Sequence, residues 1–293
     1  MSKVKSIIII NLLLFLVGLT TLHAGFDDQL TALTEENIEG YAAPLATSLG
    51  LSLNSGMYHT ADVADIFGFS IGIKSMTIFV PDDQLTFNPS LPEGYDNSNE
   101  TSTIYGNEAG YYNGPDGYIS FPGGLNSTVV PTIYPQVGLS YMGTEMMLRF
   151  IPKIEVSDDI DLFLFGGAIK HNISRYFTAM PVDIALQLGF SKVEISDIMK
   201  LNNFAVNAHV SRGFGLFSVY GGLQYENTTM DLTYTFSGDD NIQEEEEIDT
   251  TIDGTNSLGI TVGGTFKLMF FALNVDYTYN SQSVLTAGMN FEF

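Results

Sequence analysis

Few residues of this chain have side chains that could carry out catalysis. The 293 residues include four histidines and no cysteine, which excludes disulfides and thiolate metal sites. His171, Asn172 and Ser174 are residue types that lipases use, but adjacent residues of a strand point to opposite faces and cannot converge there. His209 and Asp183 fall on neighbouring inward faces, where a lone histidine is more often a hydrogen-bonded wall residue. We therefore predict no catalytic residue, no cofactor and no enzyme activity.

A group of acidic residues between positions 237 and 254 supplies oxygen ligands of the kind that divalent cations prefer. Their spacing matches no EF-hand loop, and a run of like charges usually forms a solvated loop. We favour the solvated loop, and cation binding with ions that bridge to lipopolysaccharide phosphates stays open. The weak metal candidates are Asp239, Asp240, Glu244, Glu245, Glu246, Glu247 and Asp249.

The elements that must position the remaining polar side chains are strands, because apolar and polar residues alternate from residue 66 onward. One stretch, residues 160–173, is ambiguous since both of its faces are apolar at first. Together the stretches predict about ten antiparallel strands, within a range of about 8–14, each near the length that a tilted membrane strand needs. The stretches cover residues 66–74, 133–141, 145–151, 160–173, 182–191, 204–211, 217–225, 258–266, 271–279 and 285–293.

Alternation alone does not separate a soluble sandwich, which buries its apolar face, from a membrane barrel, which turns that face outward. The apolar faces carry no charged residue, and one Lys or Arg facing the middle of a bilayer would cost about 2–4 kcal/mol. The barrel is therefore favoured, with the polar face lining its lumen. We expect the lumen charges to form ion pairs rather than a field for solutes, because a narrow lumen penalises unpaired charge. The lumen candidates are Lys74, Arg149, Lys153, Lys170, Asp183, His209 and Asp276.

The connections between these strands differ in length on the two sides of the predicted barrel. With the C-terminus in the periplasm, residues 143–144, 212–215 and 267–269 form short periplasmic turns, and residues 80–131 and 227–255 form long extracellular loops. Aromatic residues of the first loop could bind a ligand or pack the loop into a lid, and we favour the lid. These residues are Tyr105, Tyr111, Tyr112, Tyr118 and Phe121.

The first 24 residues resemble a secretory signal peptide. Lys3 and Lys5 precede an apolar run over residues 7–18, and Ala24 ends a plausible cleavage site. Residues 25–60 then form an N-terminal segment, and residues 61–293 form the barrel. The formal net charge of -23 argues against a nucleic-acid partner, because phosphate binding needs clustered Lys and Arg.

The segment over residues 25–60 has two open interpretations, a plug in the lumen or a short extra strand or periplasmic tail. Thr34 could cap a short helix that begins at Glu35, and Pro44 would end or kink that helix. Four apolar residues could line a pocket inside the lumen if the segment is a plug: Leu45, Leu49, Leu51 and Leu53.

The final strand, LTAGMNFEF, ends on Phe293 and resembles the C-terminal signal of bacterial outer-membrane barrels, which the barrel assembly machinery reads. YAAPLATSLGLSLNSG, FGFSIGIKSMTIFVPDD, GTEMMLRFIP and FGGAIKHNI are similar to outer-membrane barrel families of the domain-of-unknown-function type, distantly like long-chain fatty-acid transporters. The resemblance implies an outer-membrane location, contact with lipid and lipopolysaccharide, and a plugging N-terminal segment. Those transporters are larger barrels, so their cargo is not carried over.

The sequence thus predicts an all-β chain that forms an antiparallel transmembrane β-barrel in the bacterial outer membrane. The leading function is passive uptake or binding of a small solute, hydrophobic solutes included. The alternative is a non-transporting surface or structural barrel that acts through its extracellular loops. A barrel enzyme is a third alternative.

Overall fold

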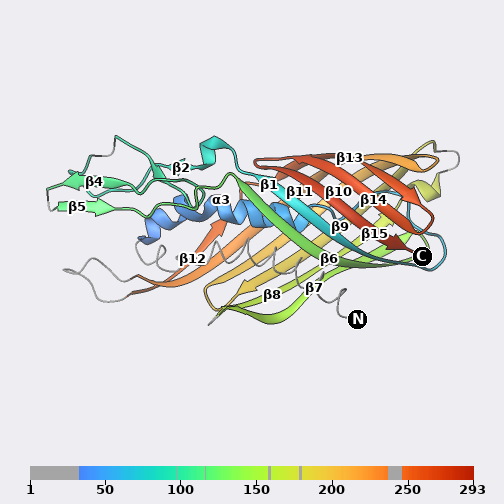
Figure 1. Ribbon diagram of the computed structural model, residues 1–293, viewed down its shortest axis with the longest axis horizontal. Coiled ribbons are helices and arrows are strands. Elements are labelled where there is room, and N and C mark those ends of the chain that lie inside the picture. The colour runs from blue at the N-terminus through green and yellow to red at the C-terminus, as the bar shows by residue number, and fades with distance from the viewer. Residues whose placement is uncertain (1–32, 97, 116, 158–159, 178–179, 237–245) are drawn as a thin grey trace.

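A computed structural model describes residues 33–96, 98–115, 117–157, 160–177, 180–236 and 246–293; the predicted signal peptide lies outside these ranges. Within them, ten strands form a closed antiparallel barrel, which confirms the predicted fold class (Figure 1). Each strand pairs with its neighbours in the sequence, and β1 closes the barrel by pairing with β15. The barrel strands are β1 (Gly68–Phe79), β6 (Val129–Tyr141), β7 (Thr144–Ser157), β8 (Ile160–Asn172), β9 (Asp183–Ile195), β10 (Met199–Phe214), β11 (Phe217–Phe236), β13 (Leu258–Leu268), β14 (Phe271–Tyr279) and β15 (Ser283–Glu292).

The apolar face of the barrel strands points outward. On β9, Leu188 is 51% exposed, whereas its neighbour Gln187 is 1% exposed. The same alternation follows β14, where Val275 is exposed and Asp276 is buried. A soluble sandwich would show the opposite distribution, so this inside-out pattern is that of a membrane barrel.

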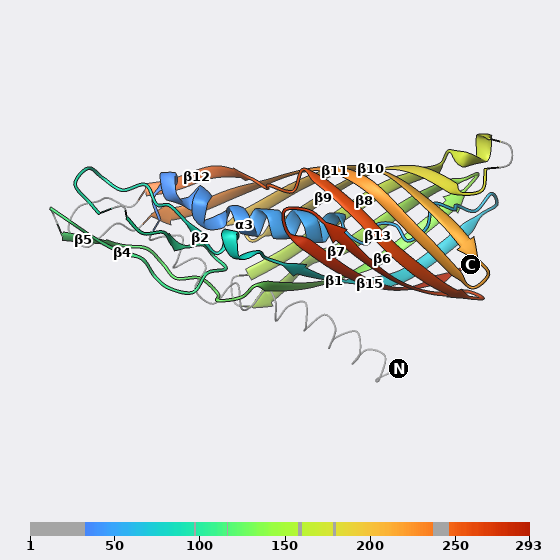
Figure 2. The ribbon, with the colours of Figure 1, turned by 90° about the horizontal axis from the view of Figure 1, so that it is seen from above.

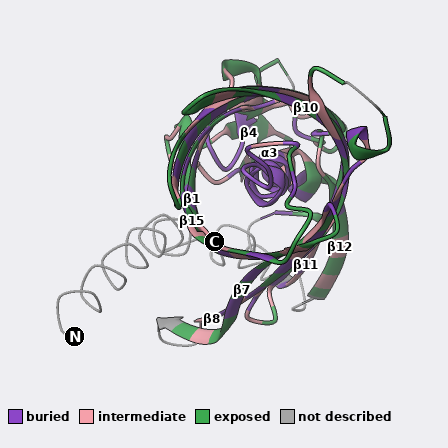
Figure 3. Cartoon of the chain, turned by 90° about the vertical axis from the view of Figure 1, so that its right-hand side faces the viewer, coloured by how far each residue is buried: buried purple, intermediate pink, exposed green. Residues whose placement is uncertain are grey.

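Helix α3 (Glu35–Asn54) lies inside the ring of strands (Figure 3). The helix continues through Pro44 and includes residues 49–54, so it does not end at Pro44, and the alternative of a short strand is wrong. Pro44 is buried inside the barrel, and its carbonyl accepts hydrogen bonds from Ser48 Oγ at 2.9 Å and from Gln282 Nε2 at 3.0 Å. Among the described residues, no helix has both the length and the apolarity that crossing a membrane would require.

The two ends of the barrel differ. At the turn end, residues 142–143, 215–216 and 269–270 connect strands beside the C-terminus, within a few residues of the predicted turns. A longer connection there, residues 173–182, carries η2 (Ser174–Tyr176). Phe69 and Phe293 exchange two backbone hydrogen bonds of 2.9 and 2.8 Å, which fixes the C-terminus at this end.

The opposite end, which we call the loop end, carries residues 80–128 between β1 and β6. In Figure 2 the β4–β5 hairpin of this segment extends beyond the barrel, away from the C-terminus. The segment is close to the predicted loop over residues 80–131, because β6 begins at Val129. Its elements are η1 (Asp82–Gln84), β2 (Thr86–Phe87), β3 (Thr101–Ser102), β4 (Tyr111–Gly114) and β5 (Gly117–Ser120).

The second predicted loop, residues 227–255, is largely strand and is corrected here. β11 continues to Phe236 and pairs with β12 (Glu246–Asp253), so the barrel wall itself is prolonged at the loop end. Alternating Thr and apolar residues in both strands account for this pairing, which the acidic composition had hidden. Of the acidic candidates, Glu246, Glu247 and Asp249 lie on β12, whereas Asp239, Asp240, Glu244 and Glu245 lie outside the described residues.

Candidate functional site

The interior is divided along the barrel axis, with an apolar half near the loop end and a polar half near the turn end. Apolar residues along α3, from Ile38 to Leu53, share one core with wall residues such as Met76, Leu201 and Leu232. The four proposed plug leucines, Leu45, Leu49, Leu51 and Leu53, are all buried in this core. They therefore pack between helix and wall, and none is an open pocket surface.

The segment over residues 80–128 covers the N-terminal half of α3. Tyr105, Tyr112 and Phe121 are buried in the same core as the helix, and burial raises the pKa of Tyr105. Tyr41 of α3 donates a hydrogen bond to the carbonyl of residue 123 at 3.0 Å. The remaining two aromatic candidates, Tyr111 and Tyr118, are exposed on the β4–β5 hairpin. The buried three thus have the packing expected of a lid.

The C-terminal half of α3 contacts the wall through polar side chains. Ser48 Oγ donates to Gln282 Oε1 at 2.6 Å, and Ser52 Oγ lies 3.1 Å from Thr132 Oγ1. Thr47 and Thr255 share a hydroxyl hydrogen bond of 3.2 Å. These bonds satisfy hydroxyl groups that would otherwise be buried without partners.

Arg149 of β7 binds the C-terminal end of α3. Its guanidinium donates to the carbonyls of Leu53 and Ser55 at 3.0 and 2.9 Å, and its Nε donates to Gln136 Oε1 at 3.0 Å. The side chain is buried, and its cation lies 5.4 Å from the ring centre of Tyr134. A cation is favourable at a helix C-terminus, where the last carbonyls lack helical partners. Arg149 therefore lies in the lumen as predicted, but it binds carbonyls where we expected a carboxylate.

Glu226 of β11, which we did not predict, lies beside the same end of the helix. Its buried carboxylate accepts hydrogen bonds from Asn54, Gln224, Asn256 and Asn280, and it forms no ion pair with another described residue. Four amide groups from the helix and the wall therefore replace a cation. The signal for its inward position was strand parity, because Glu226 lies two residues after the inward Gln224.

The other buried charges are only partly paired. Lys170 and Glu145 form an ion pair of 2.5 Å. Lys74 Nζ donates to Asn274 Oδ1 at 2.7 Å, and Asp276 accepts from the hydroxyl of Tyr220 at 2.7 Å. Lys170 therefore forms the ion pair that we expected in the lumen, whereas Lys74 and Asp276 hydrogen-bond to neutral side chains.

Lys153 is a correction, because its side chain is 70% exposed and pairs with Asp161 at the loop end. The β7–β8 pairing shifts register between Ile151 and Ile154, so the strict alternation that placed Lys153 in the lumen no longer applies.

His209 and His171, the two histidines considered for catalysis, lie in different parts of the barrel and have different partners. His209 is buried, stacks on Tyr58 with ring centres 4.0 Å apart, and bonds Asn207 Oδ1 through Nδ1 at 2.8 Å. His209 therefore does not meet Asp183, which begins β9 at the turn end.

In the second group, His171 bonds Thr144 and Tyr176, whereas Ser174 bonds Asn172 at 2.6 Å. His171 and Ser174 therefore do not converge. Among the described residues, no group of three or more His, Cys, Asp or Glu is arranged to hold a metal ion.

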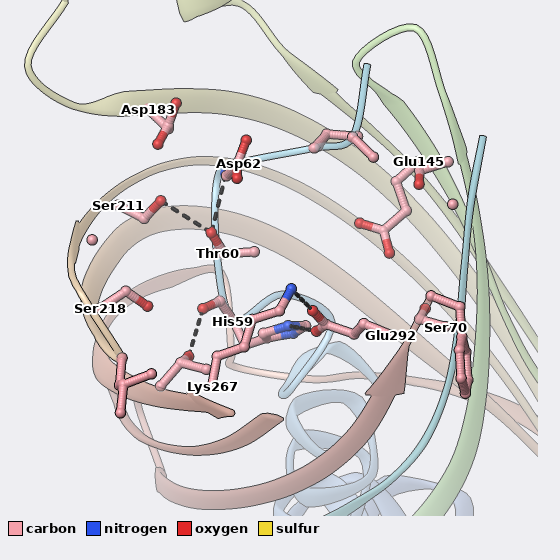
Figure 4. Close-up of a pocket in the computed structure, with 18 of the residues that line it drawn as sticks. His59, Thr60, Asp62, Ser70, Glu145, Asp183, Ser211, Ser218, Lys267 and Glu292 are labelled. Carbon is pink, nitrogen blue, oxygen red and sulfur yellow. Dashed lines mark hydrogen bonds and ion pairs between the residues drawn. The ribbon is translucent and has the colours of Figure 1, made fainter. Parts of the chain in front are cut away.

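A cavity of about 450 Å³ opens at the turn end, beyond the C-terminal end of the helix (Figure 4). His59, in the linker between α3 and β1, bonds Glu292 of β15 at 2.6 Å, and Lys267 of β13 binds the other oxygen of that carboxylate. Burial lowers the pKa of His59, with a further contribution from Lys74, although Glu292 opposes the shift. Neutral His59 therefore donates to Glu292 near pH 7. Sequence alternation could not find this contact, because the linker has no regular period.

Comparisons with known proteins give a family match and structural likenesses of low sequence identity. OmpTΔL8, a loop L8 deletion mutant of OmpT from the outer membrane of Vibrio cholerae, has 9% identity, covers 78% of this chain and 98% of its own, and has a TM-score of 0.28. Ail, the attachment invasion locus protein of Yersinia pestis in complex with the heparin analogue sucrose octasulfate, has 11% identity and a TM-score of 0.24. The match covers 78% of this chain and 99% of Ail. Neisserial surface protein A has 11% identity and a TM-score of 0.23, and the match covers 77% of this chain and 97% of that protein.

These TM-scores are too low to support an argument. The barrel fold is shown by the strand pairing and by the outward apolar face. No curated protein matches the chain. The resemblance to long-chain fatty-acid transporters stays a prediction. A family model matches residues 1–293, and the chain, a closed antiparallel β-barrel, belongs to the family of unknown function DUF6588.

Proposed function

We propose that the mature protein resides in the bacterial outer membrane with its turn end in the periplasm and its loop end outside the cell. The outward apolar face supports contact with lipid, and the final strand ending at Phe293 supports recognition by the barrel assembly machinery. In this orientation the segment over residues 80–128 and the β11–β12 extension face lipopolysaccharide. The acidic residues of β12 would then lie on the extracellular side.

Within that location, we propose passive uptake or binding of a small solute, with α3 as a plug that moves aside. The observation that carries this proposal is the polar contact between the C-terminal half of α3 and the wall. Each such hydrogen bond contributes only about 0.5–1.5 kcal/mol net, because water can replace the partner. The same half of the helix also buries Leu49, Leu51 and Leu53 in the apolar core, so a moving plug must leave these apolar contacts as well as exchange its hydrogen bonds with water. Uptake also requires the lid formed by residues 80–128 to open.

The solute we propose is polar. Hydroxyl, amide and charged side chains line the C-terminal half of the helix and the turn-end cavity. A hydrophobic solute would displace water from these groups without replacing their hydrogen bonds, which is unfavourable. We therefore set aside the hydrophobic solutes that the sequence had left open.

A disulfide between the helix and the wall tests the proposal, since the chain has no cysteine of its own. Ser52→Cys with Thr132→Cys replaces two hydroxyls that lie 3.1 Å apart on α3 and β6. In liposome-swelling assays with small sugars and amino acids, we expect oxidation to abolish solute entry and dithiothreitol to restore it.

The matched control is Thr261→Cys with Thr278→Cys, whose hydroxyls lie 2.8 Å apart on the neighbouring wall strands β13 and β14. Oxidation of this pair stiffens the wall without attaching the helix, so entry is expected to stay unchanged. Heat-modifiable gel mobility verifies that each variant is folded. If folded wild-type protein admits no solute, or if the locked helix leaves entry unchanged, a moving plug is ruled out.

The alternative is a closed barrel that acts through its external surface. The apolar packing of Tyr105, Tyr112 and Phe121 over the helix favours this alternative, because such a lid costs free energy to open. Wild-type protein that is folded but impermeable, together with loss of an adhesion or envelope phenotype when the β4–β5 hairpin is replaced by a short turn, would support it.

A further inference from the structure

The turn-end cavity contains both paired and unpaired charges. Glu292 accepts contacts from His59 and Lys267, and Glu145 is paired with Lys170. These groups are already neutralised by partners on the wall or the linker. They therefore have little charge left for a ligand.

Two other carboxylates line the cavity, Asp62 from the linker and Asp183 from the first position of β9. Neither side chain forms an ion pair or a side-chain hydrogen bond with another described residue. Figure 4 shows both on the side of the cavity away from the His59–Glu292 contact. Both also line a second cavity of about 270 Å³, so they lie where the two spaces adjoin.

The two carboxylates influence each other. Partial desolvation raises the pKa of Asp62, the negative charge of Asp183 raises it further, and the positive charges of Lys267 and Lys170 oppose the shift. A positive charge placed between the two carboxylates would relieve their repulsion. Lys267 and Lys170 are each already paired, with Glu292 and Glu145, so this end of the lumen keeps an excess of negative charge.

The surroundings indicate what kind of cation fits. The 450 Å³ volume lies within the range of about 300–1,000 Å³ that small-molecule pockets occupy. Hydroxyls of Thr60, Ser211 and Ser218 line the same space and can accept hydrogen bonds from N–H groups. A bare metal ion would lack ligands, because the described residues offer no group of three metal-binding side chains.

We propose that the turn-end cavity binds a small organic cation with one or two ammonium groups, held by Asp62 and Asp183. This inference rests on the proposed function in that it names the class of solute the barrel handles. Binding at the periplasmic mouth is the last contact of an entering solute, and the same charges would attract amines and repel anions.

Isothermal titration calorimetry of the full chain in detergent, at low ionic strength, tests the site with 1,4-diaminobutane as the probe. 1,4-Butanediol is the uncharged ligand control. We expect heat of binding with the diamine alone, and a loss of affinity of about tenfold for Asp62→Asn or Asp183→Asn, since each change removes a charge-assisted contact. The control variant Asp161→Asn lies at the loop end and should bind the diamine like the wild type.

Three results would overturn the inference. These are equal binding of diol and diamine, an equal loss of affinity in Asp161→Asn, and complete displacement of the diamine by equimolar Mg²⁺, which would indicate an inorganic cation site. The comparison of diamine with diol uses wild-type protein, so it decides the matter even if an Asn variant fails to fold.

Binding and uptake are separable outcomes. Diamine binding without entry of any solute into liposomes would contradict the uptake proposal and leave the cation site standing. Solute entry without diamine binding would contradict the cation site alone.

Discussion

Arg149 connects β7 to the last turn of α3, and we expect this contact to stabilise the folded barrel. Arg149→Gln leaves the carbonyls of Leu53 and Ser55 buried without their charged donor. Since an unsatisfied buried group costs about 1–3 kcal/mol, we expect unfolding to become easier by about 2–4 kcal/mol. Urea unfolding in lipid vesicles, followed by gel mobility, measures the change. Arg212→Gln, at an exposed position near the turn end, is the control and should stay within about 0.5 kcal/mol of the wild type.

His59 makes the barrel sensitive to acid. Its folded-state pKa is lowered by burial and by Lys74, so the unfolded chain binds a proton more readily below the ordinary value of 6.5. The stability that neutral His59 contributes is therefore complete above pH 6.5 and is lost as pH falls toward the folded-state pKa. In that window the free energy of unfolding should fall by about 1.4 kcal/mol per pH unit for this one group.

The control for this pH dependence is His59→Gln, which keeps an N–H donor for Glu292 but does not titrate. The groups that face His59, Lys74, Lys170 and Glu292, remain in both proteins. Unfolding curves between pH 8 and pH 5 should therefore diverge below pH 6.5, with the wild type losing more stability. Parallel curves would show that His59 is not the titrating group.

At the scale of residues, strand parity predicted which side chains face inward but not what they contact. Lys74, Arg149 and Asp276 are buried as their positions in alternating strands required. Their partners come from the helix, the linker and distant strands, which no local pattern relates. Lys153 was misplaced because a register shift breaks the alternation before it.

At the scale of elements, the wall was predictable, whereas only the start of the helix at Glu35 was predicted and its length was not. The outward faces of the barrel strands are largely apolar, with charges such as Lys200 and Arg212 near the strand ends, and this constraint leaves a strong period of two in the sequence. The helix lacks a corresponding pattern, because it is buried on nearly all sides and needs no polar stripe. It continues past Pro44 where nearly all of its residues are buried inside the barrel, an environment that local propensity does not contain.

Gly50 allows α3 to approach the wall closely, and this gives a prediction for the whole helix. A Cβ at this position would lie 2.1 Å from Thr228 Oγ1 and 2.9 Å from Asn256 Nδ2. Alanine ordinarily stabilises a helix by about 1 kcal/mol relative to glycine, so Gly50→Ala would be stabilising if the wall did not matter. We expect a loss of about 1–3 kcal/mol instead, because the helix must move away from β11.

Urea unfolding measures this effect, and liposome entry shows whether the displaced helix also leaks solute. Gly213→Ala on β10 is the matched control, since its Cβ would meet no atom within 4 Å. A Gly50→Ala variant more stable than wild type would mean that the helix does not pack against the wall at this point.

At the scale of the whole molecule, the outward apolar face predicts how the barrel depends on lipid. Leu188 lies midway along β9, half exposed, between Ile169 and Val206 of the neighbouring strands. Leu188→Arg should destabilise the barrel in bilayers by about 2–4 kcal/mol, whereas an arginine on a water-exposed surface would change stability by about 0.5 kcal/mol or less. Tyr141→Arg, at the turn-end rim, should cost about 0–1 kcal/mol. Equal effects at the two positions would contradict a hydrocarbon belt around the strands.

The direction of α3 predicts which parts of the chain face the outside of the cell. The helix begins at the loop end, where Leu33 accepts a hydrogen bond from Tyr234 at 3.0 Å, and it runs toward the turn end. Thr34 is exposed at the start of the helix, and Leu216 is exposed in a turn at the opposite end. A membrane-impermeant maleimide should therefore label Thr34→Cys on intact Gram-negative cells, and Leu216→Cys only after the outer membrane is permeabilised. Each variant carries a single cysteine, so the label reports one position. Labelling of Leu216→Cys on intact cells, with Thr34→Cys protected, would mean that the barrel is inserted in the opposite direction and that the cation site faces the medium.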